Sequence, residues 1–355
     1  MHLSSSIIAS LALVLPSLAL PSPSQAKDSV PGESSLFVSY SGKKTPLDPE
    51  YTRVIPATKH GAPQPDDLLF QNLLSAEWII YSFYQEAVEN FSTADFVKLG
   101  LPNTTYQRVT ELRDNEAGHV RIFQDQISDY SLKPGPCRYA FGLGNSTDTF
   151  LTLQVYIEVS SMAFLTGLVR EAKTNMSKSA LMAIAEVETR HNVWSLIDVW
   201  NVSPFSGPAD TIYPYSNQIL DSTNAFVLPG SCPAQNPVYP SPRQNLPQLA
   251  FSKKSTTGRP GSRIQFVFSD PNNQPSFGRS RDYYAVFFHG VDTISVPFNP
   301  VDNTSTIPKQ FDPTSIIIAV IADQPGAPTE HSVVAGPLIM LEQPGTLTLK
   351  EPNAV

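Results

Sequence analysis

Proline places the strongest limit on how this chain can fold. The 355-residue sequence contains 33 prolines, roughly twice the average usage, and a proline inside a helix kinks or breaks it. Four long segments nevertheless contain none, and their apolar side chains recur every three and four residues, as in helices with one buried face. We predict these helices at about residues 67–91, 103–130, 148–175 and 177–200, with Asp148 and Ser177 as the N-caps of the last two.

Four helices of similar length pack most simply as a four-helix bundle. The second and third helices are separated by a long connection that begins with Lys133-Pro134-Gly135-Pro136, which predicts the topology with one long crossover. We therefore predict an α+β multidomain protein. The expected order is a signal peptide (1–26), an extended arm (27–65), a four-helix bundle (66–202), a proline-rich linker or loop (203–250) and a β-rich C-terminal domain (251–355).

The last hundred residues change from helical spacing to short apolar runs that are rich in β-branched and aromatic residues. Turn residues separate these runs, as in a small antiparallel sandwich. The predicted strands are 263–268, 283–289, 293–298, 315–322 and 333–341.

The N-terminus indicates the secretory route. Residues 7–20 form an apolar run too short to span a membrane, and small residues at 17–19 and 24–26 offer two cleavage sites. Six N-x-S/T sequons support this interpretation, at Asn90, Asn103, Asn145, Asn175, Asn201 and Asn303. We expect a secreted or extracellular glycoprotein in which Cys137 and Cys232 pair as a disulfide. No later stretch reads as a membrane anchor.

Charge and cysteine content exclude several classes of function. The chain has 24 Lys and Arg against 32 Asp and Glu, a formal net charge of −8. This acid excess, without any basic run, argues against nucleic acid as a partner. Two cysteines are too few for a disulfide scaffold, a four-thiolate zinc site or an iron–sulfur cluster.

The strongest chemical signal is a repeated motif, E-x-x-H, on two of the predicted helices. Glu116 and His119 form one copy and Glu188 and His191 the other. This spacing puts the carboxylate and the imidazole on one helix face, one turn apart, and here on the apolar face. The other two helices each place one carboxylate on their apolar stripes, at Glu77 and Glu158.

Carboxylates on an apolar face are costly unless they are paired or bind a cation. Four glutamates and two histidines from four helices are the ligand set of a carboxylate-bridged pair of divalent metal ions. Hard carboxylates with one imidazole for each ion favour iron or manganese. The alternative is a bundle with a decayed site, in which these residues only form buried hydrogen bonds.

Residues 69–200 resemble the ferritin-like superfamily, in particular its secreted fungal branch related to plant desiccation-related proteins and to late sexual development and stress-response proteins. The resemblance is carried by the strings NLLSAEWIIYSFY, DNEAGHV, PCRYAF, YIEVSSMAFLTGL, VETRHNVW and PF. It implies that Glu116 and Glu188 bridge two ions, that Glu77 and Glu158 are terminal ligands, and that His119 and His191 each bind one ion. Tyr81, one turn after Glu77, is a candidate neighbour of the ligands, with a core position as the alternative.

The resulting functional hypothesis is a secreted di-iron or di-manganese protein that acts on dioxygen or peroxide in stress or development. Ferroxidase and peroxide-removing activities are both compatible with it. The competing hypothesis is a non-catalytic structural or cell-surface protein, with a vestigial or structural metal site and a β region that binds the cell wall or a second copy of the chain.

Overall fold

The computed structural model describes residues 52–205, 211–252, 258–313 and 316–341. The predicted signal peptide lies outside the described residues, as does most of the predicted arm. Within residues 52–65 the backbone is irregular, and Ile55 forms an isolated antiparallel bridge with Lys133.

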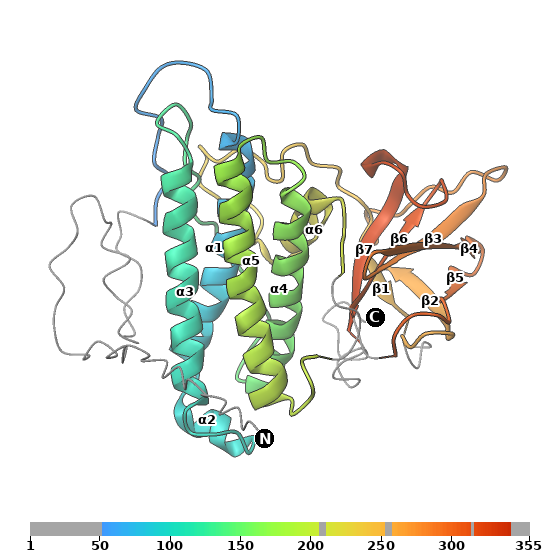
Figure 1. The fold of residues 1–355 in the computed structure, drawn as a ribbon, viewed down its shortest axis with the longest axis horizontal. Helices are drawn as coiled ribbons and strands as arrows, with labels where there is room; N and C mark the ends of the chain where they lie inside the picture. Colours follow the sequence, from blue (N-terminus) through green and yellow to red (C-terminus); the bar gives the residue numbers. More distant parts are fainter. Residues whose placement is uncertain (1–51, 206–210, 253–257, 314–315, 342–355) are drawn as a thin grey trace, which may run out of the picture.

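Four long helices lie side by side in the N-terminal half of the molecule (Figure 1). They are α1 (Asp67–Asn90), α3 (Thr105–Gln126), α4 (Thr147–Leu168) and α5 (Asn175–Trp194). Helix α1 packs against α3, and α4 packs against α5. The two pairs are joined by residues 127–146, so the arrangement is compatible with the predicted bundle and its long crossover.

The predicted N-caps of α4 and α5 are wrong by a few residues. Ser146 caps α4, because its hydroxyl accepts a hydrogen bond from the backbone N–H of Thr149 at 3.1 Å. Thr174 caps α5 by accepting from the N–H of Ser177, also at 3.1 Å. The predicted cap Asp148 therefore lies inside the first turn of α4, where a carboxylate favours the positive end of the helix.

Helix α4 also ends earlier than the sequence predicted, at Leu168. In the turn between α4 and α5, the carboxylate of Asp66, just before α1, accepts the backbone N–H groups of Lys173 and Thr174 at 2.8 and 3.0 Å. The α-helical part of α5 ends at Trp194 and continues as a π-helical turn over Ser195–Val199.

Two short helices were not predicted. Helix α2 (Thr93–Lys98) lies between α1 and α3, and α6 (Ser216–Thr223) lies inside the segment predicted as linker or loop. Helix α6 packs against α4 on one side and against strand β7 on the other (Figure 1). The segment 211–252 is thus a packed connection between the two halves of the molecule.

The C-terminal region contains two antiparallel sheets. The smaller has the order β1–β2–β5 and the larger the order β4–β3–β6–β7. Their strands are β1 (Leu249–Phe251), β2 (Arg263–Phe268), β3 (Tyr283–His289), β4 (Asp292–Phe298), β5 (Thr304–Thr306), β6 (Ile316–Ala322) and β7 (Val333–Leu341). Strands β2, β3 and β7 have the predicted bounds, β4 and β6 differ by one residue at their start, and β1 and β5 were not predicted.

The middle of the larger sheet, at β3 and β6, is buried on both faces, which explains the unbroken apolar run of β6. Ile317, Ala319 and Ile321 pack into the core shared with the smaller sheet. The alternate residues, Ile318, Val320 and Ala322, pack into the core shared with the helices. Since successive side chains of a strand point to opposite faces, a strand between two cores must be apolar at every position.

Helix α4 has a similarly central position. By length and hydropathy alone, α4 could span a membrane, although no such stretch was expected after the N-terminal leader. However, 83% of its most apolar window is buried inside the protein. It packs against α5, α6 and β7, so a helix that is apolar all round is expected here.

Candidate metal centre

Six ionisable side chains meet in the middle of the helical region. They are the six predicted metal ligands, Glu77 of α1, Glu116 and His119 of α3, Glu158 of α4, and Glu188 and His191 of α5. Each is at most 5% exposed. They form two groups, each able to offer four ligand atoms within 4.8 Å of one another, and both groups include Glu116 and Glu188.

The first group surrounds the Nδ1 atom of His119. This nitrogen lies 2.9 Å from Oε2 of Glu116, 3.2 Å from Oε1 of Glu188 and 3.6 Å from Oε1 of Glu77. Three helices therefore direct carboxylate oxygens to one imidazole.

The second group surrounds the Nδ1 atom of His191 in the same way. It lies 3.0 Å from Oε1 of Glu116, 3.4 Å from Oε2 of Glu188 and 3.4 Å from Oε2 of Glu158. Glu116 and Glu188 thus direct one oxygen to each histidine. Glu77 and Glu158 each contact one histidine only, and the centre has approximate twofold symmetry.

The two shared glutamates are held in their ionised form. Burial acts to raise the pKa of Glu188, but the charges and hydrogen bonds of both histidines hold this pKa well below its ordinary value. The pKa of Glu116 is also lowered, because its contacts with the two histidines outweigh burial and repulsion by Glu188. Conversely, burial disfavours the charged histidines, yet the surrounding carboxylates raise the pKa of both well above the ordinary value.

The two outer glutamates behave oppositely. Burial raises the pKa of Glu158 to about 8, although His191 partly opposes the shift. Burial and the charge of Glu116 raise the pKa of Glu77 well above its usual range. These shifts favour an arrangement in which protons on the two histidines and the two outer glutamates balance the charge of the two ionised central carboxylates.

Apart from their close contacts within the cluster, several of these buried atoms have no hydrogen-bond partner among the described residues. They are Glu77 Oε1, Glu116 Oε1, Glu158 Oε2, both Oε atoms of Glu188 and Nδ1 of His191. Buried polar atoms are normally satisfied. Unsatisfied carboxylate oxygens and imidazole nitrogens that converge on the same space are the donor set for hard or borderline divalent cations, so these residues fit a metal centre.

Tyr84 was not predicted from the sequence as part of the site, and its hydroxyl donates a hydrogen bond to Oε1 of Glu158. Burial and the nearby charges of Glu158 and Glu116 raise the pKa of Tyr84 well above its ordinary value, so it remains a donor. The predicted neighbour, Tyr81, lies in the apolar core and packs edge-on against Trp78. Tyr84 could have been found from its spacing, since it lies two helical turns after Glu77 on the same face.

Asn115 is a second residue that the sequence did not suggest. Its Oδ1 lies 3.5 Å from Nε2 of His191, the ring nitrogen that faces away from the carboxylates. Such contacts orient metal-binding histidines. No motif predicts this contact, because it joins α3 to α5 through the tertiary packing.

The remaining predicted sites lie far from this centre. Cys137 and Cys232 form a disulfide between the 127–146 connection and the segment after α6. The asparagine of each sequon is exposed except Asn303, which is half-buried. The five exposed ones are Asn90, Asn103, Asn145, Asn175 and Asn201.

Comparison with known proteins agrees with the helical part of this description. Residues 66–196 match the family model of the ferritin-like domain. A search of curated proteins found no match for the chain. The matched residues begin at Asp66, which caps the turn before α5, and end just after the second E-x-x-H motif, so all six clustered side chains lie within them. Residues 66–196 are thus similar to the ferritin-like domain, and a β region of two antiparallel sheets follows them in the same chain.

Proposed function

We propose that the four long helices form a bundle that holds two metal ions, iron or manganese, bridged by Glu116 and Glu188. The observation that carries this proposal is that each of these carboxylates directs one oxygen to each histidine. A carboxylate needed only for a buried ion pair has no reason to divide its oxygens between two histidines. In the proposed centre Glu77 and His119 complete one site, and Glu158 and His191 complete the other.

Charge supports two divalent ions in particular. Two such ions carry four positive charges, which equals the charge of four ionised glutamates with neutral histidines. Binding would therefore displace the protons that balance the cluster at neutral pH, without leaving a net charge in the core.

A bound iron or manganese pair would supply redox chemistry with dioxygen or peroxide. The protein would contribute the surroundings. Tyr84 holds the carboxylate of Glu158 through one oxygen and leaves Oε2 turned toward His191. Asn115 lies against the outer nitrogen of His191. The near-complete burial of all six ligands excludes bulk water and strengthens these interactions.

We further propose that the protein is secreted and acts in stress or development, as in the fungal branch that the sequence resembles. This rests on the apolar leader, on the exposure of five sequon asparagines and on the disulfide, which is typical of an oxidising compartment.

Metal analysis of a matched pair of variants tests the centre. Glu188→Gln replaces a proposed bridge, whereas Glu186→Gln changes an exposed glutamate on the same helix. We expect about two iron or manganese ions per chain in the wild type and in Glu186→Gln, and loss of both ions in Glu188→Gln. Equal metal content in the two variants, or none in the wild type, would overturn the proposal.

Spectroscopy and turnover then separate a bridged catalyst from a structural metal site. A carboxylate-bridged pair should show magnetic coupling between its ions, which isolated ions do not. Consumption of dioxygen or peroxide by the loaded wild type, absent in Glu188→Gln, supports catalysis. Coupled metal without consumption of either supports the structural alternative.

A further inference from the structure

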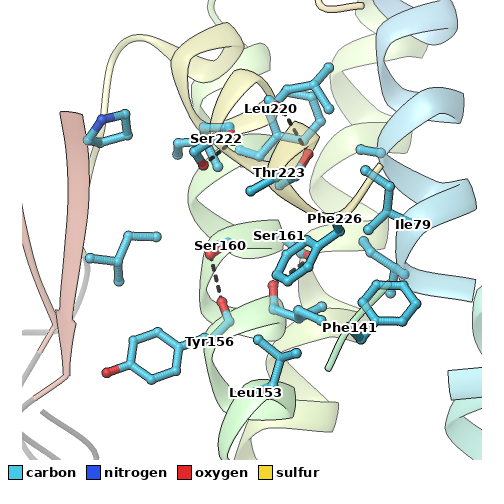
Figure 2. A pocket seen from close by; sticks show the side chains of 18 of the residues that line it. Ile79, Phe141, Leu153, Tyr156, Ser160, Ser161, Leu220, Ser222, Thr223 and Phe226 are labelled. Atoms are coloured by element: carbon cyan, nitrogen blue, oxygen red, sulfur yellow. Dashed lines mark hydrogen bonds between the residues drawn. The ribbon is translucent and has the colours of Figure 1, made fainter. Parts of the chain in front are cut away.

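A cavity of about 350 Å³ lies where the helical domain meets the β region. Its walls come from α1 and α4, from α6 and the turn after it, and from β7 (Figure 2). Protein interiors contain few voids larger than a water molecule, and unfilled apolar space is destabilising. A cavity of this size, built by three separate parts of the chain, is within the range of small-molecule sites.

Its described lining is mainly apolar. No Asp, Glu, Lys, Arg or His occurs among the described residues that form its walls. The inner wall is made of buried side chains such as Ile79, Leu153 and Phe164, whereas Ala140, Gly142 and Ala225 are exposed and lie at its mouth. A ligand could therefore enter from solvent and bury its apolar surface inside.

Four of the five hydroxyl groups in the walls are used as donors within their own helices, and Figure 2 shows these bonds. Ser160 and Ser161 donate to the carbonyls of Tyr156 and Ile157 in the preceding turn of α4, at 2.6 and 2.9 Å. Ser222 and Thr223 donate in the same way within α6, at 2.6 and 2.7 Å. These contacts leave four hydroxyl oxygens as weak acceptors, and the fifth hydroxyl of the described wall belongs to the neutral side chain of Tyr156.

A second, polar cavity close by makes the contrast clear. It shares Ser222, Ala225, Leu249 and Pro337 with the apolar cavity, and its other walls include Asp221 and Arg243. Those two side chains form an ion pair at 2.6 Å. The charged groups of this junction thus line the neighbouring space and leave the apolar cavity without any.

We infer that the apolar cavity binds a neutral, mainly hydrocarbon or aromatic small molecule. An engineered apolar cavity of about 150 Å³ takes up benzene, so 350 Å³ suits a molecule of two or three rings or a chain of similar volume. Without a charged group in the wall, burial of an ionised ligand would be uncompensated, which excludes carboxylates, phosphates and ammonium ions. The site is independent of the proposed metals, although Ala76 and Ile157 of its wall directly precede Glu77 and Glu158.

Two related dyes test the inference on the full chain. N-phenyl-1-naphthylamine is neutral, and 8-anilinonaphthalene-1-sulfonate has the same rings with a sulfonate added. In fluorescence titrations we expect one molecule of the neutral dye to bind per chain, and the sulfonate to bind at least about tenfold more weakly. Equal binding of the two dyes would overturn the uncharged class of ligand.

Variants at the mouth locate the binding. Ala225→Trp and Ala140→Trp each place a large ring at the opening from an exposed position, so the fold should be retained. Ala183→Trp, at an exposed alanine of α5 outside the cavity, is the control. We expect dye affinity to fall about tenfold or more in the two mouth variants and to be unchanged in the control. Unchanged affinity in both mouth variants would place the dye elsewhere.

Two further measurements keep the interpretation specific. Dye binding should persist in Glu188→Gln, since the cavity does not use the proposed metal ligands.

The second measurement removes residues 342–355, which follow β7 directly in the sequence. If the dye bound only after their removal, the cavity would be the seat of this chain's own C-terminal segment and the inference would be wrong.

Discussion

The helical domain and the β region fill their interiors in different ways. The core between the two sheets is formed by apolar side chains such as Phe287, Ile317 and Met340, each fully buried. The middle of the helical domain instead contains four glutamates and two histidines, nearly all as inaccessible as that core. An apolar core stabilises by burial alone, whereas buried ionisable groups are costly unless their charge is balanced. The core between the sheets can contribute stability only, whereas the helical domain combines its own apolar clusters with the buried charges of the proposed metal centre.

The largest expected effect is a loss of stability when the apolar core between the two sheets is altered. Phe287→Ala should lower the free energy of unfolding by about 3–5 kcal/mol, because it removes a fully buried ring. Denaturant unfolding with metal and with a chelator should give the same loss. Phe205→Ala, at a side chain 88% exposed, should change little. A loss that depends on metal would show that the two regions are not energetically separate.

The second-largest effect is expected from pH, because acid should weaken metal binding to the six clustered side chains. The raised pKa values of Glu158, Glu77, His119 and His191 mean that the metal-free cluster holds protons at neutral pH. Each proton displaced by an ion makes affinity fall about tenfold per pH unit as the pH is lowered. Manganese titrations between pH 8 and pH 6 should therefore weaken by about 100-fold or more per ion. Calorimetry in two buffers should detect the released protons, and a flat profile would contradict the proposed ligands.

A smaller effect should separate the two halves of the centre. Tyr84→Phe removes the hydrogen bond to Glu158 and should weaken metal binding about 10–100-fold, mainly at the His191 half. Tyr106→Phe is the matched control, since that hydroxyl donates to the backbone carbonyl of Val88. Titration of the two ions should show one weakened and one unchanged step. Equal weakening of both steps would mean that Tyr84 supports the whole cluster.

The smallest expected effect concerns the metal-free protein, in which the buried ligands should lower the free energy of unfolding. In the presence of a chelator, Glu77→Leu should stabilise the protein by about 1 kcal/mol, because a buried polar group in a charge-bearing cluster is replaced by an apolar one. Glu186→Leu, at an exposed site, should stay within about 0.5 kcal/mol of the wild type. Denaturant unfolding measures both. Clear destabilisation by Glu77→Leu would show that the proton-balanced cluster itself stabilises the fold.

Much of the helical domain could be predicted because its signals are local. Proline-free segments with helical spacing located α1, α3, α4 and α5, and the two E-x-x-H motifs placed their side chains on inner faces. The caps were misplaced because Ser146 and Thr174 compete with equally suitable neighbours, Asp148 and Ser177. Which residue of each pair caps its helix depends on the path of the chain just before that helix.

Other features depend on contacts between distant segments. Residues 203–250 were predicted as a linker or loop. Helix α6 forms within them, because its apolar side can pack against α4 and β7. Tyr84 was not predicted, because spacing alone does not tell which tyrosine of α1 contacts the carboxylate of Glu158 on α4.

By itself, the sequence determined where helices and strands can form and which ionisable residues share a helix face, since both follow from the 3.6-residue and two-residue periods. Only the tertiary structure decided that the oxygens of Glu116 and Glu188 divide between two histidines, and that the junction of α4, α6 and β7 leaves an uncharged cavity. The reason is physical. Periodicity acts over a few residues, whereas a shared centre or a cavity depends on how whole elements pack against one another.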